Sequence, residues 1–593
     1  MRATTVVAAL ALTSALLVAC TPAPGPQGGT PAPTPTPEAV HSPAVRLPGE
    51  PVTVLDSTDA ATRAAGTSAA FFAEAAVAVV VPAGDVAGQL EASAAAVSLG
   101  VPLLLTDGST VPDATAAELE RLGVEAVLIA GGLGRDDVRD GGLDVPVIVE
   151  AATDPARADD VLRVPALPVP APAPGGEVAA VAALDPASVA TQAPTDEDTD
   201  GGTDEGTEDE RTDEQDDQAA SGPSSATSSA GGGEAASEEV VQRLPLTERA
   251  DAPPGGLLLT TGDAGDLAAV ATARAAGVPV VVVPGGDPRA TSAAVQGVAA
   301  AQPTSTVALG AAFGTAPDLG WRVATAATGV ELPGGGQVLF PGRRLVAMYG
   351  TPHFAALGIL GEQDVPASIA RAQGLAASYQ PLTADVVVPA FEIIVTVASA
   401  GAGPDGNYSN ELPVESFVPW VEAARDAGVY VVIDLQPGRT DFLTQAQQYE
   451  PLLRYPNVGL ALDPEWRLAP DQVHLRQIGS VHADEVNATG AWLAELTRTH
   501  ALPQKLFVLH QFSHRMIQAR ETVATSYPEL SVMIHVDGQG SQPAKAGTWG
   551  SLQQGAPAGL TWGWKNFIDE DVPMLAPDQT YAVQPVPELV TYQ

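Results

Sequence analysis

The sequence predicts an α/β protein in which an N-terminal parallel-sheet repeat module precedes a C-terminal (β/α)8-like barrel. Continuously apolar runs alternate with helical segments in both parts, and this pattern is typical of parallel strands covered on both faces. The composition changes near residue 340. Every tyrosine, six of the seven tryptophans and seven of the eight histidines follow that point. We therefore expect two folded regions with different tasks.

The N-terminus carries the pattern of an export signal. Residues 1–19 contain an early Arg2 and an apolar stretch that is too short to span a bilayer comfortably. The motif "LVAC" ends at Cys20, the single cysteine of the chain, and resembles the lipobox of bacterial lipoproteins. This resemblance implies that Cys20 is lipidated and holds the protein at a membrane surface.

Two segments have the composition of linkers. Residues 20–48 are rich in proline and predict an extended tether that follows Cys20. Residues 167–250 include "TDEDTDGGTDEGTEDERTDEQDDQ", with thirteen acidic residues against Arg211 alone. Such a run repels itself and has no apolar area to bury, so we expect a disordered acidic linker there.

The segments on either side of the acidic linker, residues 49–166 and 251–335, resemble one another. The first contains "VAVVVPAGDVAGQLEASAAAVSLGVPLLLT" and the second "GLLLTTGDAGDLAAVATARAAGVPVVVVPGG". Each has an apolar strand, a Gly-Asp turn, an alanine-rich helix and a strand that begins with Gly-Val-Pro. We interpret them as two α/β halves of one module.

Three motifs of the first half carry a family resemblance: "GVPLLLTD" (100–107), "TAAELERLG" (115–123) and "VLIAGG" (127–132). They are similar to the cell-wall-binding repeat 2 family of Gram-positive surface proteins. The resemblance implies attachment to cell-wall polysaccharide, and with the high-GC composition it implies an actinobacterial cell envelope. We therefore expect an extracytoplasmic lipoprotein whose partners are the membrane, through Cys20, and wall glycan.

Charge and motif spacing exclude several functions. The net charge of −43 argues against a nucleic-acid partner, which needs a basic surface. The "GGLG" at 131–134 lacks dinucleotide-binding spacing, no Walker motif occurs, and we expect no cofactor. No GxSxG elbow is present either.

Residues 336–593 predict the barrel. Seven apolar runs look like strands, and an eighth strand lies in "PELVTYQ" at the end of the chain or is missing. We expect helices at 361–378, 415–427, 440–453, 482–499 and 513–526. Active sites of such barrels lie at the carboxyl ends of the strands.

The predicted strands end in polar or aromatic residues, which should meet at one mouth. These residues are Tyr349, His353, Glu392, Asp434, Asp463, Glu465, His510, Gln511, His514, Asp537, Trp562 and Lys565. An isolated aspartate after a strand usually caps the next helix. Repetition over six or seven strands favours a functional cleft instead.

Several carboxylates beside tryptophans favour glycoside hydrolysis, which uses one carboxyl group as proton donor and another as nucleophile or base. We expect Glu465 or Asp463 to donate the proton and Asp434 to be the partner carboxylate that acts as nucleophile or base. Glu392 is a further candidate for a catalytic carboxylate. The other strand-end residues, Tyr349, His353, His510, Gln511, Asp537, Trp562 and Lys565, are expected to bind substrate. Trp466, Trp562 and Trp564 are candidate sugar platforms.

Two alternatives stay open from the sequence. The barrel could bind a wall glycan or peptide without cleaving it. It could also be a metal-dependent hydrolase in which His510, His535 and Asp537 hold a divalent ion. The period of two in "IHVD" sends His535 and Asp537 to the same side of their strand.

Overall fold

The computed structural model describes residues 38–152, 154, 157–188, 243–352 and 354–593. The predicted signal peptide, Cys20, most of the tether, the acidic run and His353 lie outside these residues. Among the described helices, none combines the length and apolarity needed to cross a membrane.

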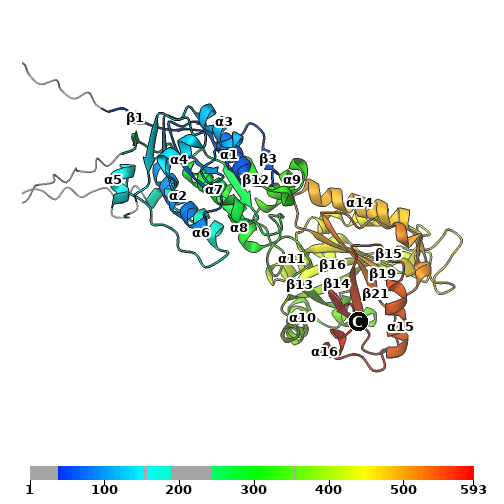
Figure 1. Cartoon of the computed structure of the whole chain (residues 1–593). Coiled ribbons are helices and arrows are strands. Elements are labelled where there is room, and N and C mark those ends of the chain that lie inside the picture. The colour runs from blue at the N-terminus through cyan, green and yellow to red at the C-terminus, as the bar shows by residue number, and fades with distance from the viewer. Residues whose placement is uncertain (1–37, 153, 155–156, 189–242, 353) are drawn as a thin grey trace, which may run out of the picture. The chain divides into compact units, whose positions relative to one another are not determined.

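The N-terminal module contains two parallel four-stranded sheets, drawn in blue, cyan and green in Figure 1. One has the order β6-β5-β7-β8, and the other has the order β11-β10-β12-β3. The strands of the first are β5 (Val77–Pro82), β6 (Leu103–Thr106), β7 (Ala126–Ile129) and β8 (Val147–Glu150). Those of the second are β3 (Val52–Leu55), β10 (Gly256–Thr260), β11 (Val280–Val282) and β12 (Ser305–Leu309).

Alanine-rich helices fill the space between the two sheets. Helices α1 (Ala60–Phe71), α2 (Val86–Leu99) and α7 (Leu267–Ala275) contribute to a single buried apolar cluster that includes strands of both sheets. Small side chains let α2 and α7 approach closely, and the Thr272 hydroxyl on α7 bonds both backbone groups of Leu103 at 3.0 Å. The remaining helices are α3 (Asp113–Leu122), α4 (Arg135–Asp140), α5 (Ala158–Leu162), α6 (Glu177–Ala182), α8 (Ser292–Ala301) and α9 (Ala316–Ala326).

The two halves are less separate than their sequences predict, because β3 precedes the first sheet in the chain but pairs with β12 in the second. The predicted linker is also wrong at its ends. Helix α6 buries Val178 and Val181 in the module core, Leu244 is buried too, and β9 (Leu246–Thr247) pairs with β1 (Val40–His41). A further short pair joins β2 (Ala44–Val45) to β4 (Phe72–Glu74).

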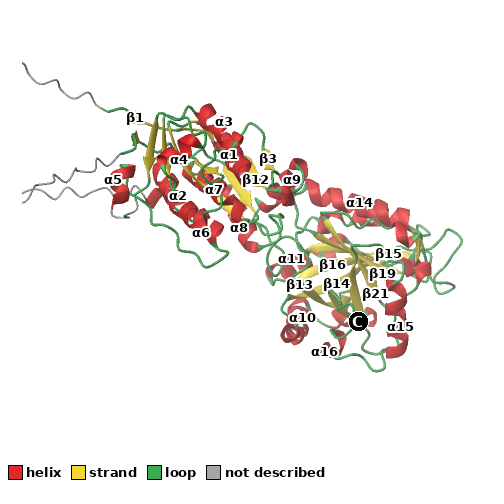
Figure 2. Cartoon of the chain, in the orientation of Figure 1, coloured by secondary structure: helices red, strands yellow, loops and turns green. Residues whose placement is uncertain are grey.

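The C-terminal region is a closed barrel of eight parallel strands, as predicted (Figure 2). Strand β13 pairs with β14 on one side and with β23 on the other, which closes the cylinder. The last strand is the terminal segment "LVTY". The strands are β13 (Arg343–Gly350), β14 (Val386–Ala398), β16 (Tyr430–Leu435), β17 (Val458–Leu462), β19 (Lys505–Gln511), β21 (Leu530–Val536), β22 (Thr561–Asn566) and β23 (Leu589–Tyr592).

Helices surround the barrel strands in Figure 2, and four of the five predicted helical segments form. They are α10 (Val365–Tyr379), α11 (Val418–Asp426), α12 (Phe442–Gln448) with α13 (Glu450–Leu453), and α14 (Ala483–Thr499); α15 (Gln542–Gln553) and α16 (Pro577–Thr580) complete the set. The helix predicted at 513–526 is wrong. That segment holds short 3-10 turns and β20 (Ile517–Gln518), which pairs with β18 (Val481–His482). Its Thr- and Val-rich second half has weak helix propensity.

The interior of the barrel follows the period of two along each strand. One buried apolar cluster takes alternate residues of seven barrel strands, including Ala347, Ala390, Val432, Val508 and Met533. The intervening residues belong to the outer core beneath the helices. The amino-end half of the interior is therefore a packed apolar plug, and the same alternation decides which side chains reach the carboxyl-end half.

Candidate functional site

Every barrel strand places one polar side chain in the carboxyl-end half of the interior, or directly after it. Seven of these residues continue the inward series of the apolar cluster by two positions each, and the eighth, Lys565, follows the inward Gly563 by two positions. The eight residues are Tyr349, Glu392, Asp434, Asp463, His510, His535, Lys565 and Thr591, all at most 4% exposed. The convergence predicted for Tyr349, Glu392, Asp434, Asp463, His510 and Lys565 is thus present in the fold.

Hydrogen bonds connect side chains from different strands in this layer. The Tyr349 hydroxyl donates to Asp434 Oδ2 at 2.8 Å. His510 lies between two carboxylates, with Nε2 2.8 Å from Glu392 Oε1 and Nδ1 3.1 Å from Asp537 Oδ2. The ammonium group of Lys565 lies 3.5 Å from the centre of the Tyr349 ring. These contacts join strands β13, β14, β16, β19, β21 and β22 in one site.

The exit of β17 brings two further carboxylates to this site. Asp463 directly precedes a 3-10 turn, η9 (Pro464–Trp466), but its side chain makes no capping hydrogen bond and its Oδ1 is buried without a partner. Glu465 lies within the turn and is partly exposed. Neither carboxylate forms an ion pair with an Arg or Lys among the described residues.

Three carboxyl groups at the site have pKa values above their usual range. Burial, reinforced by neighbouring carboxylates, raises the pKa of Asp434 to about 6 and that of Glu465 to about 7. For Glu465 the main neighbour is Asp537. Burial and then Glu465 raise the pKa of Asp463 well above its usual range. Proton donors are therefore available here near neutral pH.

Glu392, His510 and Asp537 form a row of charged groups, and His535 beside them is neutral. Burial opposes ionisation of Glu392 and Asp537, but the His510 imidazole facing both outweighs it, so both pKa values lie below the usual range. Burial likewise opposes protonation of His510, yet Glu392 and Asp434 raise its pKa well above normal. Burial lowers the pKa of His535 to about 3, so this second imidazole is neutral. Environments that separate pKa values in this way mark acid and base partners.

The predicted sugar platforms Trp562 and Trp564 lie on the outer side of the barrel, not at its mouth. Trp562 and Trp564 alternate with the inward Gly563 and Lys565, and they pack against Trp549 of α15 with ring centroids 5.9 and 5.4 Å away. Trp562 is therefore not a substrate-binding residue at the mouth. The period of two along β22 explains the error, because Lys565 and Trp562 have opposite parity.

Gln511 and His514 are also misplaced in the sequence prediction. Gln511 follows the inward His510 and points outward, where its side chain contacts Arg520 and the backbone of Ser513. His514 is exposed, and its Nε2 lies 3.0 Å from the carbonyl oxygen of Ser551. His510 belongs to β19 and His514 to the 3-10 turn that follows it, and the two imidazoles contact different partners.

Two features of the site were not predicted from the sequence. Thr591 on β23 was not predicted, and its hydroxyl lies 3.1 Å from His535 Nε2. Gly563 on β22 leaves space for the same imidazole, since a Cβ there would be 2.5 Å from His535 Cδ2. Both features could have been predicted from the period of two in "LVTYQ" and "LTWGWKN", which places Thr591 and Gly563 on the inward side of their strands.

Beside the site, the loop after η9 folds back onto the barrel. The amide of Gly479 donates to the Glu465 carbonyl at 2.7 Å. The His474 ring packs edge-on against Trp466 at 5.3 Å and Tyr408 at 6.2 Å. Trp466 is half-buried beside Glu465, so its role as a sugar platform stays a prediction.

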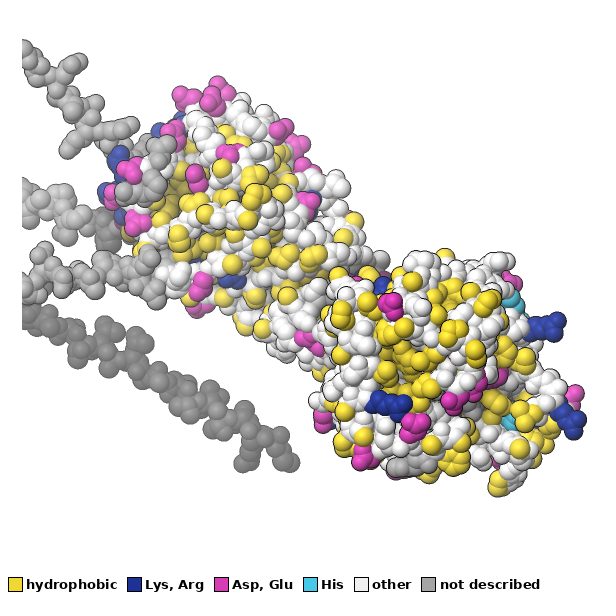
Figure 3. Space-filling model, turned by 90° about the horizontal axis from the view of Figure 1, so that it is seen from below, with side chains coloured by type: hydrophobic (Ala, Val, Ile, Leu, Met, Phe, Trp, Pro, Cys, Tyr) yellow, Lys and Arg dark blue, Asp and Glu magenta, His cyan; other side chains and the backbone are white. Residues whose placement is uncertain are grey.

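Loops at the carboxyl ends of three strands expose large apolar side chains. Phe354 follows β13, Leu475 follows β17 and Val572 follows β22, with 62%, 85% and 70% of their surfaces exposed. On the face drawn in Figure 3, apolar side chains cover broad areas, while Lys and Arg are few and scattered.

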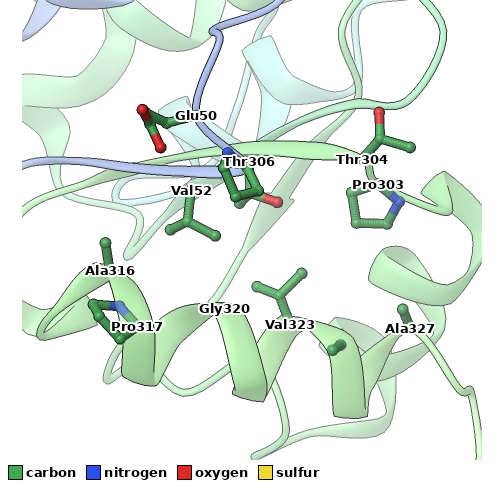
Figure 4. A pocket seen from close by; sticks show the side chains of 12 residues that line it. Glu50, Val52, Pro303, Thr304, Thr306, Ala316, Pro317, Gly320, Val323 and Ala327 are labelled. Atoms are coloured by element: carbon green, nitrogen blue, oxygen red, sulfur yellow. The ribbon is translucent and has the colours of Figure 1, made fainter.

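A hollow of about 490 Å³ in the N-terminal module is of a different kind (Figure 4). It lies between α9 and strands β3 and β12, and it is lined mainly by Val, Pro, Ala, Gly and Thr. Glu50 is its single ionisable lining residue. Because no polar groups converge there, the barrel interior remains the candidate site.

Comparison with known proteins adds little to this geometry. No family model matches the chain, and no curated protein matches it. Among solved structures, the chain is similar to Cwp6 from Clostridium difficile, with 11% sequence identity and a TM-score of 0.27. The match covers 70% of this chain and 62% of Cwp6, so it spans less than two thirds of that protein.

Proposed function

We propose that the protein is a cell-envelope hydrolase whose barrel cleaves a glycosidic bond, with Glu465 as proton donor. The observation that carries this proposal is the position of Glu465. It is a partly exposed carboxyl group with a pKa of about 7 at the edge of a site filled with other carboxylates. A general acid works best when its pKa lies near the working pH.

Asp434 is the proposed partner of Glu465. Its pKa of about 6 leaves it ionised at the pH where Glu465 still holds its proton. Between about pH 6 and 7 the two groups are therefore in opposite states, as a nucleophile or base and its acid partner require. Asp463 lies between them in the chain and is the alternative donor.

The envelope location is supported by the export signal and by Cys20 in its lipobox-like motif. Lipidation would hold the barrel near the membrane, and the repeat module is proposed to bind wall polysaccharide. Trp466 and the exposed Phe354 offer aromatic surfaces on which sugar rings could stack.

The test is incubation of the full-length chain with a panel of wall polysaccharides and measurement of reducing ends. We expect release by the wild type and loss of release in Asp434→Asn, Asp463→Asn and Glu465→Gln. Glu450→Gln is the matched control, because Glu450 pairs with Arg454 on the barrel exterior. Glycan binding without release would instead select the non-catalytic surface protein.

A further inference from the structure

Three fully buried side chains from three strands present ligand atoms to one point. Glu392 lies on β14, His510 on β19 and His535 on β21. One oxygen or nitrogen atom of each lies within 4.8 Å of the other two. The set differs from the trio predicted from sequence, since Glu392 takes the place of Asp537.

One ring nitrogen of each imidazole contacts a further side chain, and the other ring nitrogen faces Glu392. Asp537 Oδ2 lies 3.1 Å from His510 Nδ1, and Thr591 Oγ1 lies 3.1 Å from His535 Nε2. These contacts leave His510 Nε2 and His535 Nδ1 directed at the Glu392 carboxylate, at 2.8 and 3.9 Å. Metal-binding histidines are typically oriented in this way by a partner on the second ring nitrogen.

Several buried polar atoms around this point have no hydrogen-bond partner among the described residues. They are Glu392 Oε2, His535 Nδ1 and Asp434 Oδ1, whose side chains are fully buried. Asp434 Oδ1 lies 4.0 Å from His510 Nε2. Leaving a buried polar group without a partner is energetically unfavourable, so three in one place need a ligand that satisfies them together.

We propose that Glu392, His510 and His535 bind a divalent first-row transition-metal ion, with Asp434 Oδ1 placed to hold a fourth ligand or a bound water. Two imidazole nitrogens and a carboxylate form a donor set suited to Zn²⁺ and related ions. Asp537 and Thr591 are positioning residues that orient the two imidazoles. The inference does not depend on the substrate, so it stands or falls separately from glycan cleavage.

The test uses the tag-free full-length chain after dialysis against EDTA. Calorimetric titration with Zn²⁺ should show one tight site per chain, and Co²⁺ should give visible absorption bands of a nitrogen- and oxygen-ligated ion. Weak binding by the acidic surface gives neither a stoichiometric site nor such bands. A wild-type chain without a tight site and without Co²⁺ bands would overturn the proposal, and this readout needs no variant.

Variants assign the ligands. Glu392→Gln and His535→Gln should weaken Zn²⁺ binding by at least about 100-fold. Asp537→Asn should weaken it by about 10–100-fold at unchanged stoichiometry, as expected for a residue that only orients a ligand. His514→Asn is the matched control, because His514 is exposed and bonds Ser551, and it should bind as the wild type does. Equal affinity in all four variants would place the ion elsewhere and contradict the assignment.

The two proposals fail in distinguishable ways. A chain that binds one Zn²⁺ but releases no reducing ends keeps the metal site and loses the glycosidase proposal. A chain that cleaves glycan equally before and after EDTA treatment, and that shows no tight Zn²⁺ site, keeps the glycosidase proposal and loses the metal site.

Discussion

The repeat module and the barrel both contain carboxylates at the exits of parallel strands, but these carboxylates make different contacts. In the module, Asp85 Oδ1 accepts a hydrogen bond from the Gly88 amide at 2.9 Å, and Asp263 Oδ1 accepts one from the Gly265 amide at 2.8 Å. Both cap the turn or helix that follows. In the barrel, Asp463 caps nothing and is buried beside other carboxylates.

The closure of the sheet explains this difference. Strands of an open sheet end along an edge, so each exit carboxylate meets mainly its own following helix. Strands of a closed barrel end around a ring, and their inward side chains meet across it. The same short motif, an aspartate after an apolar strand, is therefore structural in one region and available for chemistry in the other.

The largest expected effect comes from neutralising the barrel carboxylates. Glu465→Gln and Asp434→Asn should reduce glycan release by about 10²–10⁴-fold, the usual contribution of a general acid or base. The measurement is kcat for reducing-end release by the full-length chain. Asp263→Asn is the matched change in the module and should leave kcat unchanged; equal losses in both regions would contradict the distinction.

Gly563→Ala should have the next largest effect. A new Cβ would meet the His535 ring at 2.5 Å, so the imidazole must move and the barrel pays about 1–3 kcal/mol of strain. We expect a clear loss of both activity and thermal stability. Gly547→Ala in α15 is the control, because nothing lies within 4 Å of its Cβ position, and it should be neutral or stabilising. Retention of full activity by Gly563→Ala would place His535 outside the working site.

Tyr349→Phe should move the pH dependence rather than abolish activity. The Tyr349 hydroxyl lowers the pKa of Asp434, so its removal should raise that pKa above about 6. Because Asp434 acts in its ionised form, the acid limb of kcat should shift to higher pH. A shift of one pH unit means about a tenfold loss of activity on that limb. Tyr455→Phe, which loses an exposed contact to Glu422, should leave the profile unchanged.

The smallest effect is expected in the module. Asp85→Ala removes the cap of α2 and should destabilise the module by about 0.5–2 kcal/mol without changing glycan release. Chemical denaturation followed by circular dichroism measures the first quantity, and the reducing-end assay measures the second. Loss of glycan release at a temperature where the module is still folded would mean that the module takes part in the reaction.

Much of the fold follows from simple periodicity. Apolar runs located seven of the eight barrel strands, and the terminal "PELVTYQ", which the sequence left open as an eighth, supplies the closing strand. The helix expected at 513–526 fails because tertiary pairing of β20 with β18 outweighs a weak helical pattern. The ends of the acidic linker fail because a few apolar residues, such as Val181 and Leu244, are sufficient to dock onto an existing core.

A site residue can be predicted only where it is known which alternate residues of its strand face the barrel interior. Asp434, Asp463 and His510 lie two positions beyond an inward apolar residue, and the sequence assigns them to the mouth. Gln511 and Trp562 lie one position away from an inward residue and therefore face outward. Pairing partners such as Thr591 with His535 depend on the order of strands around the ring, which sequence periodicity does not contain.

The most direct test of the account is the pH profile of the full-length chain on an aryl glycoside and on a natural glycan. With the natural glycan, kcat/KM should be highest between about pH 6 and 7 and fall on the alkaline side as Glu465 loses its proton. Glu465→Gln should lose natural-glycan cleavage, keep aryl glycoside cleavage, whose leaving group needs no proton, and lack the alkaline limb. An alkaline limb that persists in Glu465→Gln would contradict the assignment of the barrel carboxylates.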